Sequence, residues 1–281
     1  MDNLAGRVAV VTGAASGLGR AMALAFAAEG MHVALADVDE GNLARVADEV
    51  RARGVEALAL RVDVSKGEEV DALAARAVAE LGGVHLVCNN AGVSPLGAAW
   101  ENSVADWRWA LGVNLWGVIH GVRAFVPRFV AQNEGHIVNT ASVAGLIAPP
   151  GMSVYNVTKH AVVALSESLY HDLRARNSKV GVSVLCPAYV PTGISDSERN
   201  RPTELANPAA AKSAEQLARE AMLKKAVASG KISAAEVAQA VVAAVKAQRF
   251  YILTHPRIKG AIEARMHDIL EERAPRNPLA L

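Results

Sequence analysis

Cysteine, aromatic residues and an excess of either charge are all scarce in this chain. Its 281 residues include two Cys, four each of Trp, Tyr and Phe, and 29 Lys and Arg against 28 Asp and Glu, for a formal net charge of +1. Two cysteines are too few for a disulfide scaffold or a thiolate metal site. A balanced charge provides no general attraction to nucleic acid or to an anionic membrane. We therefore expect a cytoplasmic protein with buried thiols at Cys88 and Cys186.

Long uncharged apolar runs are also absent. The apolar stretch over residues 112–131 is interrupted by Asn114, His120 and Arg123, whereas a membrane-spanning helix needs about 20 predominantly apolar residues. The N-terminus carries an acid at Asp2 and no apolar segment of the signal-peptide type. No two of the eight His stand four residues apart. We therefore expect no membrane span, no signal peptide and no metal site.

The chain instead alternates short apolar runs with longer helical ones. Seven runs of about five or six residues are apolar on both faces, as strands covered by helices on both sides must be: 7–12, 32–36, 57–62, 84–89, 136–141, 181–186 and 250–254. Helical periodicity lies between them, over 18–29, 40–53, 68–81, 104–130, 154–176 and 234–247. This order predicts an α/β fold in one domain over residues 1–281, a Rossmann-like doubly wound parallel sheet of about seven strands.

Two segments interrupt the alternation. Residues 193–230 form a polar, Ala-rich insertion far longer than an ordinary connection of about 2–6 residues, and we expect a substrate lid with a poorly packed start. Its later part, 214–228, has apolar residues at helical spacing, which are expected to form a helix face that rests on the substrate: Leu217, Ala221, Met222 and Val227. Residues 255–281 form a C-terminal extension with one helical run.

The first strand runs into a glycine-rich turn that opens a helix. Residues 12–19 read Thr-Gly-Ala-Ala-Ser-Gly-Leu-Gly. Glycines in this position let the backbone approach a pyrophosphate at the positive end of a helix. They would also serve simple packing, and their spacing differs from the common G-x-G-x-x-G. The turn predicts a dinucleotide site on Gly13, Ser16, Gly17, Leu18 and Gly19.

An acid at the end of the second strand indicates which dinucleotide is bound. Asp37 stands 18 residues after Gly19, where a carboxylate can accept hydrogen bonds from the adenosine ribose hydroxyls. A 2′-phosphate about 4 Å away would be repelled by roughly 4 kcal/mol at an effective dielectric near 20. Neither Ser16 nor Val38 supplies a compensating cation, so we expect NAD in preference to NADP. Asp63, which ends the third strand, contacts the adenine edge or caps the next helix.

A phenol and an ammonium stand one helical turn apart at Tyr155 and Lys159. To act as a base near pH 7, Tyr155 needs a pKa roughly two to three units below its reference value near 10, and a nearby cation favours phenolate. Most isolated Tyr and Lys pairs at this spacing lie on a protein surface and have no catalytic role. Ser142 precedes Tyr155 by 13 residues and ends a buried strand, where ligand crevices form in open α/β sheets. Its hydroxyl is a candidate to hold a substrate oxygen.

Taken together, these features resemble the short-chain dehydrogenase/reductase family over nearly the whole chain. The resemblance rests on the glycine turn at 12–19, Asn89-Asn90-Ala91-Gly92, Asn114, the Ser142, Tyr155 and Lys159 spacing, and Pro187-Ala188-Tyr189-Val190-Pro191-Thr192. Ala188 departs from the glycine usual in the family, and its Cβ narrows the pocket there.

The resemblance implies hydride transfer between a nicotinamide cofactor and a secondary alcohol or ketone. Tyr155 is then the acid–base residue, Ser142 holds the reacting oxygen, and Lys159 lowers the pKa of Tyr155 and holds the nicotinamide ribose. Asn114 anchors a water that links Lys159 to solvent. The implied cofactor-binding residues are Gly13, Ser16, Gly17, Leu18, Gly19, Asp37, Asp63, Val64, Asn90, Ala91, Gly92, Tyr155, Lys159, Pro187, Val190 and Thr192.

The expected substrate pocket is mostly apolar. Its predicted lining is Ser94, Val143, Ala144, Met152 and Tyr189, which favours a bulky apolar or aromatic secondary alcohol as the small-molecule substrate. Helices 104–130 and 154–176 carry more apolar surface than one sheet face covers, and members of the resembled family pair such helices across a two-fold axis. We therefore expect a homotetramer or homodimer. Trp107, Trp109, Phe125 and Phe129 are candidates for core or interface.

Three other functions stay open. An NADP-dependent carbonyl reductase would share the fold and the catalytic residues. A catalytically silent dinucleotide-binding sensor would bind cofactor without turnover, although relatives of that type typically lose the Tyr or the Lys. A methyltransferase on a related glycine turn has no use for Tyr155 and Lys159. Turnover measured on a panel of secondary alcohols separates these alternatives.

Overall fold

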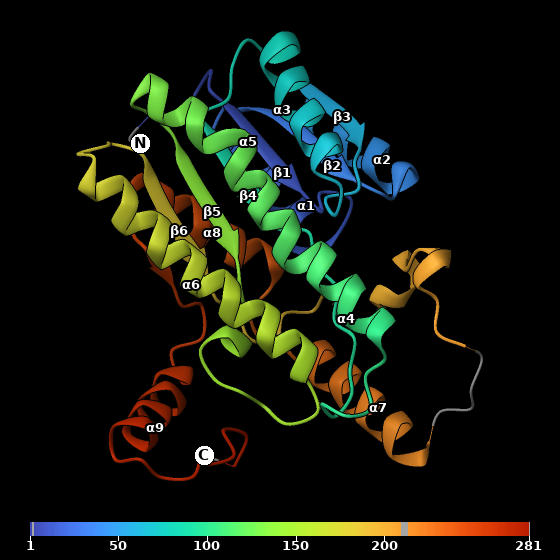
Figure 1. Cartoon of the computed structure of the whole chain (residues 1–281). Coiled ribbons are helices and arrows are strands. Elements are labelled where there is room, and N and C mark those ends of the chain that lie inside the picture. The colour runs from blue at the N-terminus through green and yellow to red at the C-terminus, as the bar shows by residue number, and fades with distance from the viewer. Residues whose placement is uncertain (2, 209–212, 281) are drawn as a thin grey trace.

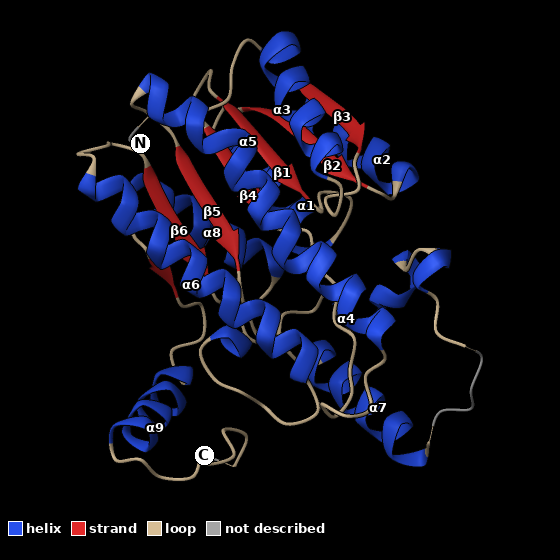
Figure 2. Ribbon diagram, viewed as in Figure 1, coloured by secondary structure: helices blue, strands red, loops and turns tan. Residues whose placement is uncertain are grey.

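The apolar runs of the sequence become the seven parallel strands of one sheet, as predicted. In this computed structural model, which describes residues 1, 3–208 and 213–280, the strand order is β3-β2-β1-β4-β5-β6-β7 (Figure 2). The strands are β1 (Val8–Thr12), β2 (His32–Asp37), β3 (Ala57–Arg61), β4 (Leu86–Asn89), β5 (His136–Thr140), β6 (Gly181–Leu185) and β7 (Tyr251–Ile252). The run 250–254 is thus shortened to two residues at the sheet edge, where short strands limit unwanted pairing.

Helices cover both faces of the sheet. On one face lie α1 (Gly17–Ala28), α2 (Glu40–Arg51) and α8 (Ala234–Lys246). On the other lie α3 (Gly67–Leu81), α5 (Gly117–Gln132) and α6 (Ser153–Ala175), which cross in front of the strands in Figure 1. Because both faces are covered, every residue of β1, β4, β5 and β6 is buried. This is the Rossmann-like, doubly wound arrangement that the alternation predicts.

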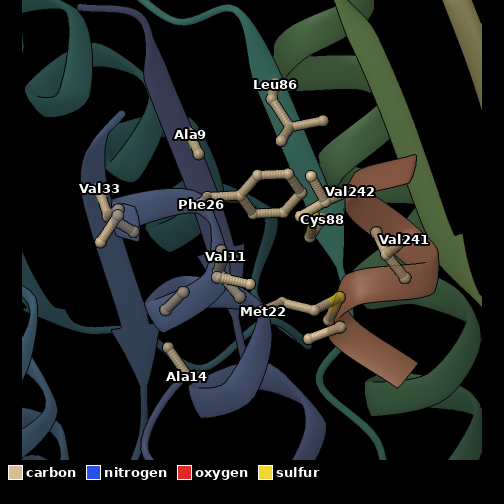
Figure 3. Packing of buried hydrophobic residues seen from close by; sticks show 14 of the residues in the cluster. Ala9, Val11, Ala14, Met22, Phe26, Val33, Leu86, Cys88, Val241 and Val242 are labelled. Atoms are coloured by element: carbon tan, nitrogen blue, oxygen red, sulfur yellow. The ribbon is translucent and has the colours of Figure 1, made fainter. Parts of the chain in front are cut away.

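The core beneath α1 and α8 is packed around Phe26, which is fully buried. Figure 3 shows its ring between Leu86 of β4 and Val242 of α8, with Val11 and Cys88 nearby. Alternate residues of a strand share a face, so these strand residues all point toward the two helices. This packing holds α1 and α8 against the sheet.

Both cysteines are free and buried, as the sequence analysis expects. Burial raises the pKa of Cys186 to about 12, so its thiol keeps its proton near neutral pH. None of the helices in residues 3–208 and 213–280 has the length and apolar character that a membrane crossing requires. Within the same residues, no three His, Cys, Asp or Glu side chains gather in a way that would hold a metal ion.

The helix predicted over 104–130 is not uniform. It begins as α4 (Val104–Ala110), continues as a π-helix over Leu111–Trp116, and becomes α5. A π-helical turn contains an extra residue, and such turns recur at functional sites. No local signal in the sequence indicates this wider turn. It contains Asn114, whose side chain is fully buried.

In Figure 1 the insertion begins at the right of the molecule and continues into α7 at the lower end, where the C-terminal extension also lies. The insertion contains the 3-10 helices η3 (Gly193–Asn200) and η4 (Thr203–Leu205) and the α-helix α7 (Ala214–Ala228), while 209–212 lie outside the described residues. The C-terminal extension contains α9 (Ile258–Leu270), which stands apart from the sheet in Figure 1.

The chain turns to opposite sides of the sheet at one point. From β1 the sheet continues to β2 and β3 on one side and to β4, β5, β6 and β7 on the other. The loops that follow β1 and β4 therefore diverge at the carboxyl ends of these two strands. Open α/β sheets bind their ligands in the crevice at such a switch point.

Candidate active site

A cavity of about 430 Å³ opens at the carboxyl ends of the strands. Its wall contains most of the predicted cofactor residues: Gly13, Ser16, Gly17, Leu18, Asp37, Asp63, Val64, Asn90, Ala91, Gly92, Pro187, Val190 and Thr192. It also contains Ser142, Tyr155 and Lys159, and the predicted substrate residues Ser94, Val143, Ala144, Met152 and Tyr189. Gly19 and Asn114 are outside this wall.

The glycine turn combines close packing with an open anion site. Gly13 has φ +66°, and a Cβ on Gly19 would stand 2.0 Å from the carbonyl oxygen of Gly13. Gly19 therefore serves packing, which is one of the two alternatives left open by the sequence. Ser16 precedes α1 without capping it by its side chain, and no acid stands in the first turn. The free N–H groups and the helix dipole fit a pyrophosphate.

Asp37 is held beside this turn. Its Oδ2 accepts a hydrogen bond from the Ala15 amide at 2.9 Å, and its Oδ1 accepts one from the Asp39 amide at 3.1 Å. Each oxygen keeps a further lone pair for an outside donor. No Lys or Arg of residues 3–208 and 213–280 forms a salt bridge with Asp37. The arrangement fits ribose hydroxyls, and the two arginines nearby in the cavity wall, Arg61 and Arg199, are not paired with Asp37.

Asp63 lines the cavity and also stabilises the turn that leads into α3. Its Oδ1 accepts hydrogen bonds from the amide and the hydroxyl of Ser65, at 3.0 and 2.7 Å. The helix itself is preceded by Lys66, so Asp63 is not its N-cap. The hydrogen bonds are those of a turn in which an Asp side chain bonds the backbone two residues on.

Thr12 joins the ends of β1 and β4. Its Oγ1 accepts hydrogen bonds from the amides of Asn90 and Ala91 at 2.9 and 3.1 Å, while Asn90 Nδ2 donates to the Thr12 carbonyl at 3.0 Å. Beneath them, Asn89 donates to Asn139 at 2.9 Å. These buried bonds fix the loop after β4 against the glycine turn. Asn139 was not singled out from sequence, because no local motif marks it.

Tyr155 and Lys159 face the cavity from one side of α6. The Nζ of Lys159 lies 5.5 Å from the centre of the Tyr155 ring and donates to the Thr140 carbonyl at 2.9 Å. Burial raises the pKa of Tyr155 to about 12, against an opposing effect of the Ser142 hydroxyl. Burial also lowers the pKa of Lys159 to about 8. The lowered pKa expected for Tyr155 is therefore not a property of the ligand-free chain, because burial outweighs the opposing hydrogen bond of Ser142.

Asn114 reaches the same region from the π-helical turn. Its Oδ1 accepts from the Val93 amide at 2.8 Å, and its Nδ2 donates to the Val93 carbonyl at 2.9 Å and to Thr158 Oγ1 at 3.1 Å. A Cβ on Gly92 would stand 3.5 Å from Asn114 Oδ1 and 3.6 Å from Lys159 Nζ. The loop after β4 thus passes between Asn114 and Lys159, and Asn114 fixes it there.

Replacing Lys159 by Met should make the chain more stable at pH 7. The ordinary Lys pKa is 10.5 and burial lowers it to about 8, so the folded state carries an unfavourable cation that costs about 3 kcal/mol at pH 7. Part of the gain is lost with the hydrogen bond to Thr140, worth about 1 kcal/mol. We expect a net increase of about 2 kcal/mol in the free energy of unfolding, measured by urea denaturation.

The stability difference between Lys159→Met and wild type should depend on pH. Between about pH 8 and 10.5 the folded wild type has lost the proton while the unfolded chain keeps it, so wild-type stability rises with pH. The advantage of Lys159→Met should therefore shrink at pH 9.5. The exposed Lys259→Met is the control and should change little at either pH. A Lys159→Met variant that is less stable than wild type at pH 7 would contradict the burial argument.

The start of the insertion is firmly packed, contrary to the sequence expectation. The Arg201 side chain is only 6% exposed; it pairs with Asp106 and its guanidinium lies 4.4 Å from the centre of the Trp109 ring. Burial alone would raise the pKa of Asp106, yet hydrogen bonds from Arg201 and Asn207 hold it below its usual value. The hydroxyl of Ser197 also accepts from the Ser94 amide at 3.1 Å. The segment containing η3 and η4 is therefore anchored to α4.

The helix α7 lies at the predicted residues but is rotated from the predicted orientation. Leu217 and Met222 are 54% and 70% exposed, so they do not rest on the cavity as expected. Of the four predicted residues, Val227 does line the cavity, together with Leu223, which was not predicted. Alternating Ala and charged residues give α7 no strong apolar face, and helical spacing alone did not identify the inner side.

Further cavity residues come from segments distant in sequence. Trp109 is buried and forms part of the wall, where the sequence left core and interface open. Other wall residues not singled out from sequence include Arg61, Ser65, Pro149, Ile194, Arg199 and Leu205. Several of them belong to the long insertion and reach the cavity only through the fold, so no sequence motif identifies them.

Known proteins resemble this chain over most of its length. Residues 7–203 match the family model described as short chain dehydrogenase. The chain is 32% identical over 278 residues to the CLA biosynthesis dehydrogenase/reductase of Lactiplantibacillus plantarum, covering 98% of this chain and 97% of that protein. It is 43% identical over 189 residues to the 1-deoxy-11-beta-hydroxypentalenate dehydrogenase of Streptomyces exfoliatus, covering 66% and 68%. The crystal structure of a short chain dehydrogenase/reductase from Burkholderia phymatum in complex with NAD is 54% identical, with a TM-score of 0.97 and complete coverage of both chains.

Proposed function

The chain belongs to the short-chain dehydrogenase/reductase family, and from that membership we propose that it interconverts a secondary alcohol and its ketone with NAD. It is an oxidoreductase that acts on CH–OH groups. One observation carries the more specific proposal. Ser142, Tyr155 and Lys159 line the same cavity as the glycine turn and Asp37, so acid–base groups and a dinucleotide cradle meet in one place.

We propose that the dinucleotide lies along the loops after β1, β2 and β4. The N-terminal turn of α1 holds the pyrophosphate, and Asp37 accepts from the adenosine ribose. Asp63 and Val64 border the adenine, while Asn90, Ala91, Gly92, Pro187, Val190 and Thr192 border the nicotinamide half. Support for NAD comes from the NAD complex of the Burkholderia phymatum protein and from the lack of a cation paired with Asp37 among the described side chains.

The proposed chemistry divides between cofactor and protein. When bound, the oxidised nicotinamide cofactor would supply the hydride acceptor for the carbinol carbon and a positive charge near the phenol of Tyr155. Tyr155 takes the hydroxyl proton, and in reduction it returns that proton. In this scheme the Ser142 hydroxyl turns from the Pro187 carbonyl, 3.3 Å away in the ligand-free chain, to donate to the same substrate oxygen and stabilise its developing negative charge. Lys159 favours the phenolate and holds the nicotinamide ribose, and Asn114 anchors a water beside Lys159.

The substrate we propose is a bulky apolar or aromatic secondary alcohol. Met152, Tyr189, Trp109 and Leu205 supply apolar and aromatic wall. The direct test is turnover of a panel of secondary alcohols with NAD, from 2-propanol to 1-arylethanols. We expect the highest kcat/KM for the larger apolar members. No turnover on any member, with tight NADH binding, would favour the silent sensor.

Replacing Asp37 by Ala should narrow the preference for NAD over NADP. The carboxylate that repels a 2′-phosphate is lost, together with its bonds to the ribose hydroxyls. We expect kcat/KM with NAD to fall about 10- to 100-fold, which corresponds to about 1.4–2.7 kcal/mol, while kcat/KM with NADP rises. Steady-state kinetics with both cofactors measure this, and Asp71→Ala on α3, which does not line the cavity, is the control. Wild-type turnover that is equal or faster with NADP would instead support the NADP-dependent reductase.

We further propose that the chain forms a homotetramer or homodimer in the cytoplasm. Trp109, Phe125 and Phe129 are buried within the subunit. Trp116 on the π-helical turn and Val157 on α6 are both 49% exposed, which leaves apolar surface for a helix-to-helix interface. The two free thiols suit a reducing compartment. Because Arg201 anchors η3 and η4, the moving part of the proposed lid over 193–230 is α7.

A further inference from the structure

The loop that follows β6 is held from two opposite sides. On one side, the Pro187 carbonyl accepts hydrogen bonds from the Val143 amide at 2.9 Å and from the Ser142 hydroxyl at 3.3 Å. On the other side, the Ala188 amide donates to Nδ1 of His255 at 3.2 Å. The peptide unit between Pro187 and Ala188 thus connects Ser142 with His255, which lies 67 residues after Ala188.

His255 belongs to the C-terminal extension and follows the edge strand β7. The register of β7 brings it to this loop, because the Cys186 amide donates to the Ile252 carbonyl at 3.0 Å. The hydroxyl of Thr254 also lies 2.8 Å from Nδ1. Burial lowers the pKa of His255, against an opposing effect of the Tyr189 backbone. The imidazole is therefore neutral near pH 7, with an acceptor at Nδ1 and its proton on Nε2.

The second ring nitrogen of His255, Nε2, indicates the role of this side chain. Nε2 of His255 is buried and has no hydrogen-bond partner. A buried polar atom without a partner destabilises the folded state, and an apolar side chain would avoid that cost. The one feature that an apolar residue cannot reproduce is the acceptor at Nδ1, which receives the Ala188 amide.

The peptide held by His255 borders both halves of the proposed reaction site. Pro187 and Tyr189 line the cavity on either side of Ala188. Behind Tyr189 the chain is closely packed, because a Cβ on Gly230 would stand 2.4 Å from the Tyr189 carbonyl oxygen. The orientation of the Ala188 amide therefore determines the position of the Pro187 carbonyl relative to Ser142. It also determines the position from which the Tyr189 side chain extends.

We propose that His255 is a positioning residue for the oxidoreductase reaction, whose neutral Nδ1 orients the Pro187–Tyr189 segment against Ser142 and the substrate. The inference rests on the proposed function and adds to it a residue from the C-terminal extension. His255 has no contact with the reacting atoms in this scheme. It acts through Ala188, Pro187 and Ser142.

Two polar replacements separate the acceptor from the ring. His255→Asn places an amide oxygen near the position of Nδ1, whereas His255→Gln places it near the position of Nε2. We expect His255→Asn to keep kcat within about threefold of wild type and His255→Gln to lose about 10- to 100-fold, because displacement of a reacting group by about 1 Å can cost about 100-fold. NADH affinity should change less than about threefold in either variant. His267→Asn on α9, an exposed histidine, is the control.

Hydrogen exchange at the Ala188 amide provides a readout that needs no turnover. Exchange should be faster by about tenfold or more in His255→Gln and near wild type in His255→Asn, because only the former removes the acceptor. Wild-type protein without turnover would contradict the proposed function and leave this exchange test intact. Equal kcat in the Asn and Gln variants, whether both are active or both impaired, would overturn the positioning role, as would exchange that does not differ between them.

Discussion

Replacing Tyr155 by Phe is expected to lower kcat for alcohol oxidation by about 100- to 10,000-fold, the range of general acid–base catalysis by a positioned side chain. The change removes one hydroxyl and keeps the ring against α6. In the ligand-free chain burial raises the pKa of Tyr155 to about 12, so the phenol is neutral and the variant removes no charge. NADH affinity should therefore stay within about threefold of wild type, measured by fluorescence titration.

The matched control is Tyr170→Phe, a second tyrosine on α6 whose ring packs edge-on against Phe250 at 5.2 Å. It lies outside the cavity wall, so kcat should be unchanged. If Tyr155→Phe retained more than about a tenth of the wild-type rate, Tyr155 would not be the proton carrier. Loss of NADH binding together with turnover would point to a collapsed site and not to lost acid–base chemistry.

The second large effect is expected from Gly19→Ala. The added Cβ would stand 2.0 Å from the Gly13 carbonyl oxygen and 2.7 Å from Asn90 Nδ2, so the turn and the loop after β4 have to separate. Overpacking of this kind costs about 1–3 kcal/mol or more. Because the separation moves the first turn of α1, we expect NADH affinity to fall at least about tenfold and Tm to fall by several degrees, as calorimetry would show.

Gly260→Ala is the control for Gly19→Ala. It tests whether the lower NADH affinity and Tm come from the close packing at Gly19 or from replacing any Gly by Ala. Gly260 lies in α9, where an added methyl group would have no atom within 4 Å, and its φ is not in the left-handed range. Ala is a better helix former than Gly by about 1 kcal/mol. The same substitution should therefore stabilise α9 and leave NADH affinity unchanged. A Gly19→Ala variant as stable as Gly260→Ala would refute the close approach of the turn to Gly13.

Local pattern was sufficient for the sheet and for the cofactor end of the site. Strands buried on both faces are apolar at most positions, so β1 and β6 could be recognised without knowledge of their partners. The glycine turn and Asp37 end consecutive strands, and parallel neighbours bring their carboxyl ends to one edge. Tyr155 and Lys159 stand four residues apart on one helix, so their shared face also follows from the sequence.

Contacts between distant segments were not predictable in this way. The pairing of Arg201 with Asp106 joins residues 95 apart, and nothing near either residue indicates the other. The periodicity of α7 predicted a helix with the right bounds, but the side that faces the cavity depends on its neighbours. The raised pKa of Tyr155 follows from burial in the completed fold, which no spacing of residues reports.

The π-helical turn contains one extra residue, so the relative orientation of α4 and α5 depends on the exact number of residues between them. Most loops at the surface accept insertions and deletions, but α4, the turn and α5 form one continuous rod between the capping box at Ser103 and the core residue Phe125. Each residue added to or removed from a helix rotates everything beyond it by about 100°. A one-residue deletion within Leu111–Trp116 would thus turn Trp109 away from Arg201 while leaving Phe125 in the core. Across homologues, the spacing between these two residues should therefore be kept even where the side chains between them are exchanged.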